Sequence, residues 1–156
     1  MNQSMATFGA DQMTGDDIIA RLKLQPHPEG GWYRVTWAGD ETPRATGTCI
    51  YFLLKQGESS HWHRIDAVEI WHFYAGYPVV LSLAETAAGP ARDHLLGPDL
   101  LAGQSPQVIV PKDHWQAARL DVSAPPDGWA LVGCTVSPGF TFDGFTLADP
   151  GFDIPR

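Results

Sequence analysis

Basic residues, cysteine and long apolar runs are all scarce in this chain of 156 residues. Ten lysines and arginines stand against 18 aspartates and glutamates, which gives a net charge of -8. Nucleic acids and anionic membranes bind basic patches, so neither is an expected partner. No apolar run approaches the ~20 residues of a membrane-spanning helix, and the start of the chain has no secretion-signal pattern. We therefore expect a cytoplasmic protein.

The two cysteines, Cys49 and Cys134, each lie in an apolar run. Buried thiols behave as small apolar side chains, so we expect two reduced cysteines rather than a disulfide. The chain also lacks a phosphate-binding loop, a G-x-S-x-G nucleophile motif and a C-x-x-C motif. These absences leave no sign of an organic cofactor or of a cysteine or serine nucleophile.

The length fits one domain, which we place at residues 14–156 after a flexible N-terminal tail of residues 1–13. The segment from Thr14 to Leu24 is the one good helix candidate. Thr14 and Asp17 have the spacing of a capping box, and apolar residues follow at helical intervals. Two prolines and two glycines in residues 25–31 then end the helical pattern.

The rest of the chain has the pattern of short β-strands. Eight runs are rich in β-branched and aromatic residues, and glycine, proline, aspartate or serine separate most of them. The runs are residues 32–37, 46–54, 67–74, 79–85, 107–110, 116–120, 129–136 and 142–147. Regular short strands of this kind predict a β-sandwich or a barrel of the jelly-roll type.

Histidines and a glutamate are concentrated in one segment, residues 57–76. His61 and His63 are two residues apart, and on a regular strand such side chains share a face. Glu69 follows closely. Two imidazoles and a carboxylate on one face predict part of a ligand set for a divalent metal such as Fe, Mn, Ni or Zn.

This segment resembles the first motif of the cupin superfamily, a glycine followed by H-x-H, a glutamate and a second glycine. Glu69 and Gly76 keep the family spacing, whereas the gap between His63 and Glu69 is one residue longer than usual. Residues 103–116 resemble the second motif. There Asp113 replaces a glycine, and Gln116 stands where the fourth ligand, a histidine, would be.

Four longer blocks, residues 26–37, 59–78, 108–120 and 131–149, look like the signature of the cupin_5 family. The resemblance implies an all-β fold, the cupin-type double-stranded β-helix, which is a jelly-roll barrel, here with one short N-terminal helix. It does not select a reaction, because this fold hosts isomerases, epimerases, dioxygenases, decarboxylases, lyases and binding proteins.

The resemblance implies a metal site made of His61, His63, Glu69 and Gln116. An amide oxygen is a weak ligand beside imidazole, but this set would leave coordination positions open for Lewis-acid catalysis. In the alternative interpretation the pocket holds no metal, and Gln116 is a hydrogen-bonding lid.

Strand parity sorts the side chains that follow Glu69. If Glu69 points into the barrel, Trp71 and Phe73 do so too, while His72 and Tyr74 point to the other face. A β-bulge after Glu69 would reverse this order. Trp71 and Phe73 are therefore candidate substrate-binding residues, together with Gln116.

The block HPEGGWYR supplies a carboxylate, a phenol and a guanidinium: Glu29, Tyr33 and Arg34. Arg34 could bind a carboxylate or phosphate of a substrate through two hydrogen bonds, or instead form an ion pair with Glu29 or Asp66. Tyr33 could act as a general acid or base. By parity Tyr33 and Arg34 face opposite ways, so only one is expected inside the barrel.

These observations predict an enzyme that binds a small polar or anionic metabolite, carbohydrate-like or carboxylated, in the barrel. We expect a metal-assisted isomerase, epimerase or lyase in which Glu69, His63 and Tyr33 act on the substrate. Two alternatives stay open: a metal-free epimerase-like enzyme, with a histidine as base and Tyr33 or Tyr74 as acid, and a non-catalytic binding module. Six tryptophans suggest exposed aromatic surface and hence a homodimer.

Overall fold

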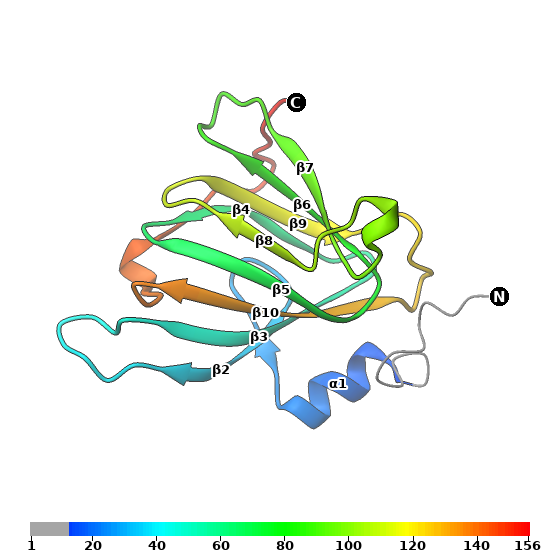
Figure 1. The fold of residues 1–156 in the computed structure, drawn as a ribbon, viewed down its shortest axis with the longest axis horizontal. Helices are drawn as coiled ribbons and strands as arrows, with labels where there is room; N and C mark the ends of the chain where they lie inside the picture. The colour runs from blue at the N-terminus through cyan, green and yellow to red at the C-terminus, as the bar shows by residue number, and fades with distance from the viewer. Residues whose placement is uncertain (1–12) are drawn as a thin grey trace.

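The computed structural model describes residues 13–156, which form two antiparallel β-sheets packed face to face, with one α-helix below them (Figure 1). The six-stranded sheet has, in spatial order, β1 (Gln25–Pro26), β2 (Trp32–Ala38), β3 (Thr48–Lys55), β10 (Trp129–Ser137), β5 (Val68–Gly76) and β8 (Gln107–Val110). The five-stranded sheet has β11 (Phe145–Leu147), β4 (Ser59–Ile65), β9 (Trp115–Leu120), β6 (Val79–Ala84) and β7 (Arg92–Leu96). The expected all-β jelly-roll architecture with one short helix is confirmed.

Helix α1 (Gly15–Leu22) begins at the predicted capping box. The Thr14 side chain accepts a hydrogen bond from the Asp17 amide at 3.1 Å, and the Asp17 carboxylate accepts one from the Thr14 amide at 2.9 Å. The helix ends before the predicted Leu24, because Lys23 is left-handed with a φ of 57°. Ile18 packs α1 against Leu53 on the outer face of the six-stranded sheet.

Each of the eight predicted runs overlaps an observed strand, but one run is only partly extended, and strands β1, β4 and β7 lie outside the eight runs. Residues 142–144 form a short 3-10 turn, η3 (Phe142–Gly144), so only the second half of the predicted strand 142–147 is extended. Strand β7 was not predicted, because Arg92, Asp93 and His94 are exposed on an edge strand and show no apolar alternation. The predicted tail lies outside the described residues except for Met13, whose carbonyl oxygen accepts a hydrogen bond from the Trp129 indole at 2.8 Å.

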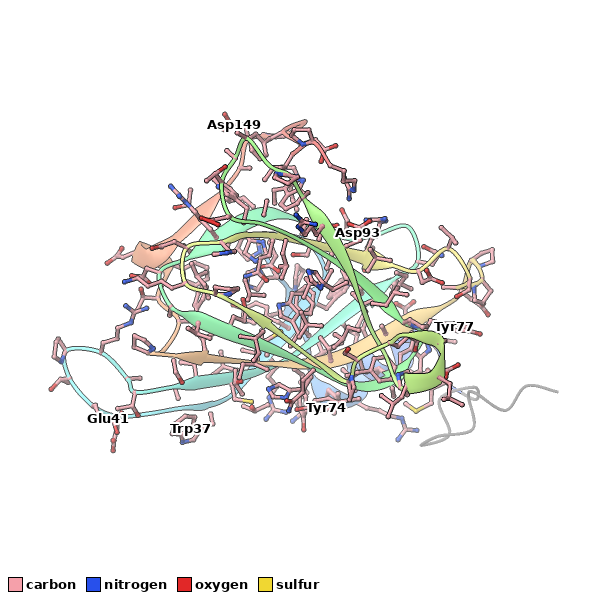
Figure 2. All side chains as sticks on the ribbon, turned by 45° about the horizontal axis from the view of Figure 1, so that its top comes forward. Trp37, Glu41, Tyr74, Tyr77, Asp93 and Asp149 are labelled. Carbon is pink, nitrogen blue, oxygen red and sulfur yellow. The ribbon has the colours of Figure 1, made fainter. Side chains whose placement is uncertain are left out.

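Side chains occupy most of the space between the sheets, whereas Trp37 and Tyr74 point outward from the six-stranded sheet (Figure 2). Cys49 and Cys134 are both free. They lie on neighbouring strands but are offset by one position: Cys134 pairs with Ile50, and Cys49 pairs with Thr135. Within residues 13–156 no helix is long and apolar enough to cross a membrane.

Candidate functional site

A cavity of about 260 Å³ lies at one end of the space between the sheets. The inner side chains of β3 show how it arises: Thr48, Ile50 and Phe52 line the cavity, whereas Leu54, at the far end of the strand, lies in the solid core. Most of the walls are aliphatic or aromatic. The polar exceptions are dominated by four titratable side chains, which are His27, Glu29, His63 and Glu69.

Glu29 reaches the barrel interior because a tight loop, residues 27–31, turns inward between β1 and β2. Gly30 and Gly31 have φ angles of 108° and 76°, which favour glycine. A Cβ on Gly30 would collide with the Ser59 carbonyl oxygen. The Glu29 carbonyl accepts a hydrogen bond from the His61 amide at 2.8 Å, which fastens the loop to β4.

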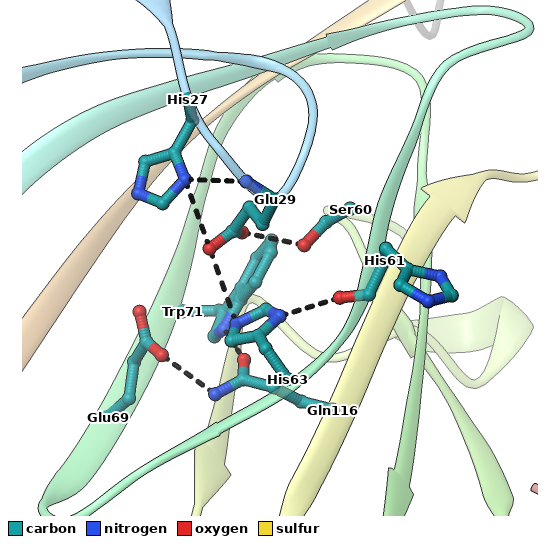
Figure 3. A network of polar contacts seen from close by, with 8 residues as sticks. All are labelled: His27, Glu29, Ser60, His61, His63, Glu69, Trp71 and Gln116. Carbon is teal, nitrogen blue, oxygen red and sulfur yellow. Dashed lines mark hydrogen bonds and ion pairs between the residues drawn. The ribbon is translucent and has the colours of Figure 1, made fainter. Parts of the chain in front are cut away.

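The Glu29 carboxyl group lies between two imidazoles and a hydroxyl group (Figure 3). Oε2 accepts a hydrogen bond from Ser60 Oγ at 2.6 Å. Oε1 lies 3.4 Å from His63 Nε2 and 3.4 Å from His27 Nδ1. His63 Nδ1 lies 2.7 Å from the His61 carbonyl oxygen, which can only accept, so the Nδ1 proton is fixed there. In the neutral ring Nε2 is then an acceptor directed at Glu29.

Burial decides the protonation of this pair. It raises the pKa of Glu29 to about 8, although the hydrogen bond from Ser60 works in the opposite direction. Burial also lowers the pKa of His63, while the nearby Glu69 partly counteracts this effect. At neutral pH Glu29 is therefore mainly a neutral acid beside a neutral imidazole, so the 3.4 Å contact does not join two fixed opposite charges.

His27 is also neutral. Its Nδ1 accepts a hydrogen bond from the Glu29 amide at 3.1 Å, so the ring proton is on Nε2. Burial, followed by the proximity of His63, lowers the pKa of His27 to about 4.

The second carboxyl group, Glu69 on β5, is held by a chain of hydrogen bonds. Gln116 Nε2 donates to Glu69 Oε1 at 2.8 Å, and Gln116 Oε1 accepts from the Trp71 indole at 2.9 Å. Burial raises the pKa of Glu69 to about 7, and the positive form of His63 lowers it in part. Glu69 is thus partly ionised at neutral pH, unlike Glu29.

The prediction that His61 and His63 share a face is wrong. A bulge in β4 leaves the four residues from Ser60 to His63 opposite three residues of β9, Gln116 to Ala118, so Ser60 and His63 both point inward. His61 turns to the outer side, where its Nε2 lies 2.9 Å from the Asp149 carbonyl oxygen (Figure 3). His61 therefore does not reach the cavity.

The prediction that Gln116 is a metal ligand is also wrong. Its side chain is completely buried and its oxygen is already bonded to Trp71, so the amide presents its nitrogen to Glu69. Across residues 13–156 no group of three or more histidine, cysteine, aspartate or glutamate side chains has the arrangement of a metal site. The expected set for Fe, Mn, Ni or Zn is therefore not assembled, and these residues do not fit a metal.

The remaining predicted residues divide between the two faces as parity requires. Tyr33 and Trp71 line the cavity. Arg34 lies outside and donates to the Leu22 carbonyl at 3.3 Å, so its predicted role as a substrate-binding residue of the cavity is corrected. Phe73 does point inward, but it packs against the solid core rather than the cavity. The ion pair predicted for Arg34 is made instead by Arg44 with Asp66, at 2.7 Å.

Sequence reasoning missed the roles of His27 and Ser60 and did not place Glu29 in the site. The HPEGG block could have indicated His27 and Glu29, because there a histidine and a glutamate flank a proline before two glycines. Nothing in the sequence marks Ser60, because the bulge that turns it inward depends on pairing with β9.

The family profile Cupin_5, described as "Cupin superfamily (DUF985)", matches residues 16–148. The chain belongs to the Cupin_5 family. The resemblance seen in the sequence is thus confirmed, and the family includes the loop that carries Glu29 as well as both sheets.

Solved structures agree with this assignment. Protein SO0799 from Shewanella oneidensis is 41% identical, with a TM-score of 0.80 over 88% of this chain and 85% of that one. A hypothetical protein from Leishmania major is 28% identical, with a TM-score of 0.80 over 90% of each chain. An oxalate decarboxylase mutant from Bacillus subtilis is 13% identical, with a TM-score of 0.58 over 80% of this chain and 30% of that one, and shares the fold alone. No curated protein matches the chain.

Proposed function

We propose that this cupin is a metal-free isomerase or epimerase that moves a proton on a small molecule bound in the barrel. The observation that carries the proposal is the presence of two buried carboxyl groups, Glu29 and Glu69, on the walls of one cavity. Two titratable groups whose environments give them different pKa values are suited to act as an acid and a base. Proton transfer, rather than polarisation by a metal, is the chemistry these side chains can supply.

In this proposal the Glu69 carboxylate is the base, because its pKa of about 7 leaves much of it ionised at neutral pH. It takes a proton from a carbon next to a carbonyl group, and the electron pair of the broken C–H bond moves toward the carbonyl oxygen. The Glu29–His63 pair returns its own proton to carbon, and solvent then restores both groups. Tyr33 lines the same cavity and is a further candidate acid.

The experiment uses three probes in D₂O: acetone, acetophenone and pyruvate. Proton NMR would follow the exchange of hydrogen for deuterium next to each carbonyl group. We expect the protein to accelerate exchange for at least one probe, and Glu69→Gln to lose at least about tenfold of that acceleration. Glu85→Gln, which removes an exposed carboxylate outside the cavity, is the matched control and is expected to retain it.

The pH dependence provides a second readout. Activity should rise as Glu69 ionises near pH 7 and fall as Glu29 loses its proton near pH 8, which gives a narrow maximum between these values. A probe that binds in the cavity without any exchange would instead favour the second candidate, a non-catalytic binding module. The apolar walls of the cavity suit such a module equally well.

A further inference from the structure

The ring of His27 lies inside an aromatic cluster on the cavity wall. Five rings have their centroids 4.5 to 6.5 Å from that of His27, and they belong to Tyr33, Phe52, Phe140, Phe142 and Phe145. All except Phe145 also line the cavity. Phe142 is 56% exposed, which places this aromatic wall at the opening to solvent. A molecule that enters the barrel here passes between apolar and aromatic surfaces.

Among residues 13–156, the side chains that line the cavity include neither lysine nor arginine. Two arginines of neighbouring elements are bound elsewhere: Arg34 to the Leu22 carbonyl, and Arg44 to both oxygens of Asp66 at 2.7 and 3.2 Å. An anion moved from water into this cavity would lose its hydration without gaining a cationic partner.

The two carboxyl groups of the cavity also disfavour the binding of an anion. When Glu29 and Glu69 carry protons they offer an anion no positive charge, and when either is ionised it repels the anion. While His27 and His63 are neutral, exclusion of anions therefore holds in every protonation state of the two carboxyl groups. An uncharged ligand avoids both penalties.

One hydrogen-bond donor on the cavity wall is available to such a ligand. His27 Nδ1 accepts from the Glu29 amide, so the ring proton is on Nε2, and Nε2 has no hydrogen-bond partner within residues 13–156. No described side-chain nitrogen or oxygen is both sealed from solvent and without a partner, so Nε2 is not sealed in the core. Because His27 lines the cavity and its side chain is only 6% exposed, Nε2–H opens into that cavity.

From these observations we infer that the barrel selects an uncharged, mainly apolar small molecule whose carbonyl oxygen accepts a hydrogen bond from His27 Nε2. The inference rests on the proposed function for the identity of the site and names its substrate class. It departs from the polar or anionic metabolite expected from the sequence. The cavity volume of about 260 Å³ is smaller than the ~300–1,000 Å³ of most ligand pockets, so it also limits the size of the ligand.

Three probes of nearly equal shape test this inference on the full chain. Acetophenone is uncharged and has a carbonyl oxygen, α-methylstyrene replaces that oxygen by a CH₂ group, and benzoate is an anion. Binding would be followed through the NMR cross-peak of the Trp71 indole N–H, which lies on the cavity wall. We expect acetophenone to bind about threefold to tenfold more tightly than α-methylstyrene, the effect of one neutral hydrogen bond, and benzoate to bind more weakly than both.

Two variants assign the effect to particular atoms. His27→Phe keeps an aromatic ring but removes this donor, so it should remove most of the preference for acetophenone over α-methylstyrene. Val35→Arg places a cation at the cavity opening, where Val35 is half exposed, and should tighten benzoate binding about tenfold. Val35→Met is the matched uncharged control. If His27→Phe fails to fold, the comparison of probes in the unmodified protein and in the Val35 variants still tests the inference.

Benzoate binding as tight as that of acetophenone in the unmodified protein would overturn the inference. So would binding of neither uncharged probe at millimolar concentration, or an unchanged preference for acetophenone in folded His27→Phe. Failure of the proposed function looks different: acetophenone would bind with the predicted selectivity, but no hydrogen exchange would follow.

Discussion

The two ends of the barrel interior are built from the same strands but have opposite chemistry. At one end Leu54, Leu81 and Val132 belong to a solid aliphatic core. At the other end the inner positions of the same sheets surround a cavity with two carboxyl groups and two imidazoles. The difference teaches that strand alternation decides which side chains point inward, whereas their position along the strand decides whether they meet a packed core or a polar cavity.

Burial has a different cost at each end. Burial of a leucine in the packed end stabilises the fold, because apolar surface is removed from water. A carboxyl group in the cavity loses hydration and therefore keeps its proton to a higher pH. The cavity end tolerates this cost because its polar atoms are connected. Ser60 donates to Glu29, and Gln116 joins Glu69 to Trp71.

The largest loss of stability is expected when a side chain in the packed end is shortened. Leu81 is fully buried, so Leu81→Ala should lower the free energy of unfolding by about 2–5 kcal/mol, measured by urea denaturation. Ile50→Ala, in a wall of the cavity, should cost less than half as much, because that side chain already borders open space. Equal losses would mean that the cavity end is as closely packed as the core.

Breaking the hydrogen-bond chain comes next. Gln116→Leu keeps the approximate volume but leaves Trp71 without its acceptor and Glu69 without a donor. We expect a loss of about 1–3 kcal/mol in the free energy of unfolding. Gln107→Leu, at an exposed position on β8, is the control and should change stability by less than about 0.5 kcal/mol. A neutral Gln116→Leu would contradict a structural role for the amide.

The pH dependence of stability distinguishes the two ends, because the carboxyl groups that titrate near neutral pH lie at the cavity end. Between pH 6.5 and 8 the unfolded chain has released the glutamate proton that folded Glu29 retains, because the pKa of Glu29 rises from 4.5 to about 8 on folding. Stability should therefore fall as the pH rises through this window, by about 2 kcal/mol from Glu29 alone. His27, whose pKa falls from 6.5 to about 4 on folding, has the opposite effect, most of which lies below pH 6.5.

Thermal unfolding at several pH values measures this slope. Glu29→Gln cannot titrate and should flatten it, although Glu69 leaves a residual slope near pH 7. Glu85→Gln, an exposed substitution, should leave the slope unchanged. Stability that rises from pH 6.5 to 8 in the unmodified protein would mean that Glu29 is ionised in the folded state.

The smallest effect is expected from a chelator. EDTA should not shift the melting temperature, because His61 faces outward and the Gln116 oxygen is bonded to Trp71. Elemental analysis of protein purified without nickel should give far less than one equivalent of Fe, Mn, Ni or Zn, for both the unmodified chain and His63→Ala. Near-stoichiometric metal that His63→Ala removes would restore the ligand set expected from the sequence.

Local sequence rules predicted much of the fold and part of the site. The capping box fixed the start of α1, and alternation after Glu69 correctly placed Trp71 inside and His72 outside, where it lies 3.0 Å from Thr135 Oγ1. Both depend on neighbours within a few residues. The predicted homodimer depends on a surface that no sequence rule describes, and it stays a prediction.

The sequence by itself determined the family, the strand pattern and the inward direction of Glu69, because these follow from local periodicity and motif spacing. Only the tertiary structure decided which polar groups meet in the cavity. The bulge that brings Ser60 in and turns His61 out arises from pairing with β9, and the loop that inserts Glu29 is fastened to β4 across 32 residues of sequence. Long-range pairing of this kind, and the burial that raises the pKa of each carboxyl group, exist only once the two sheets have come together.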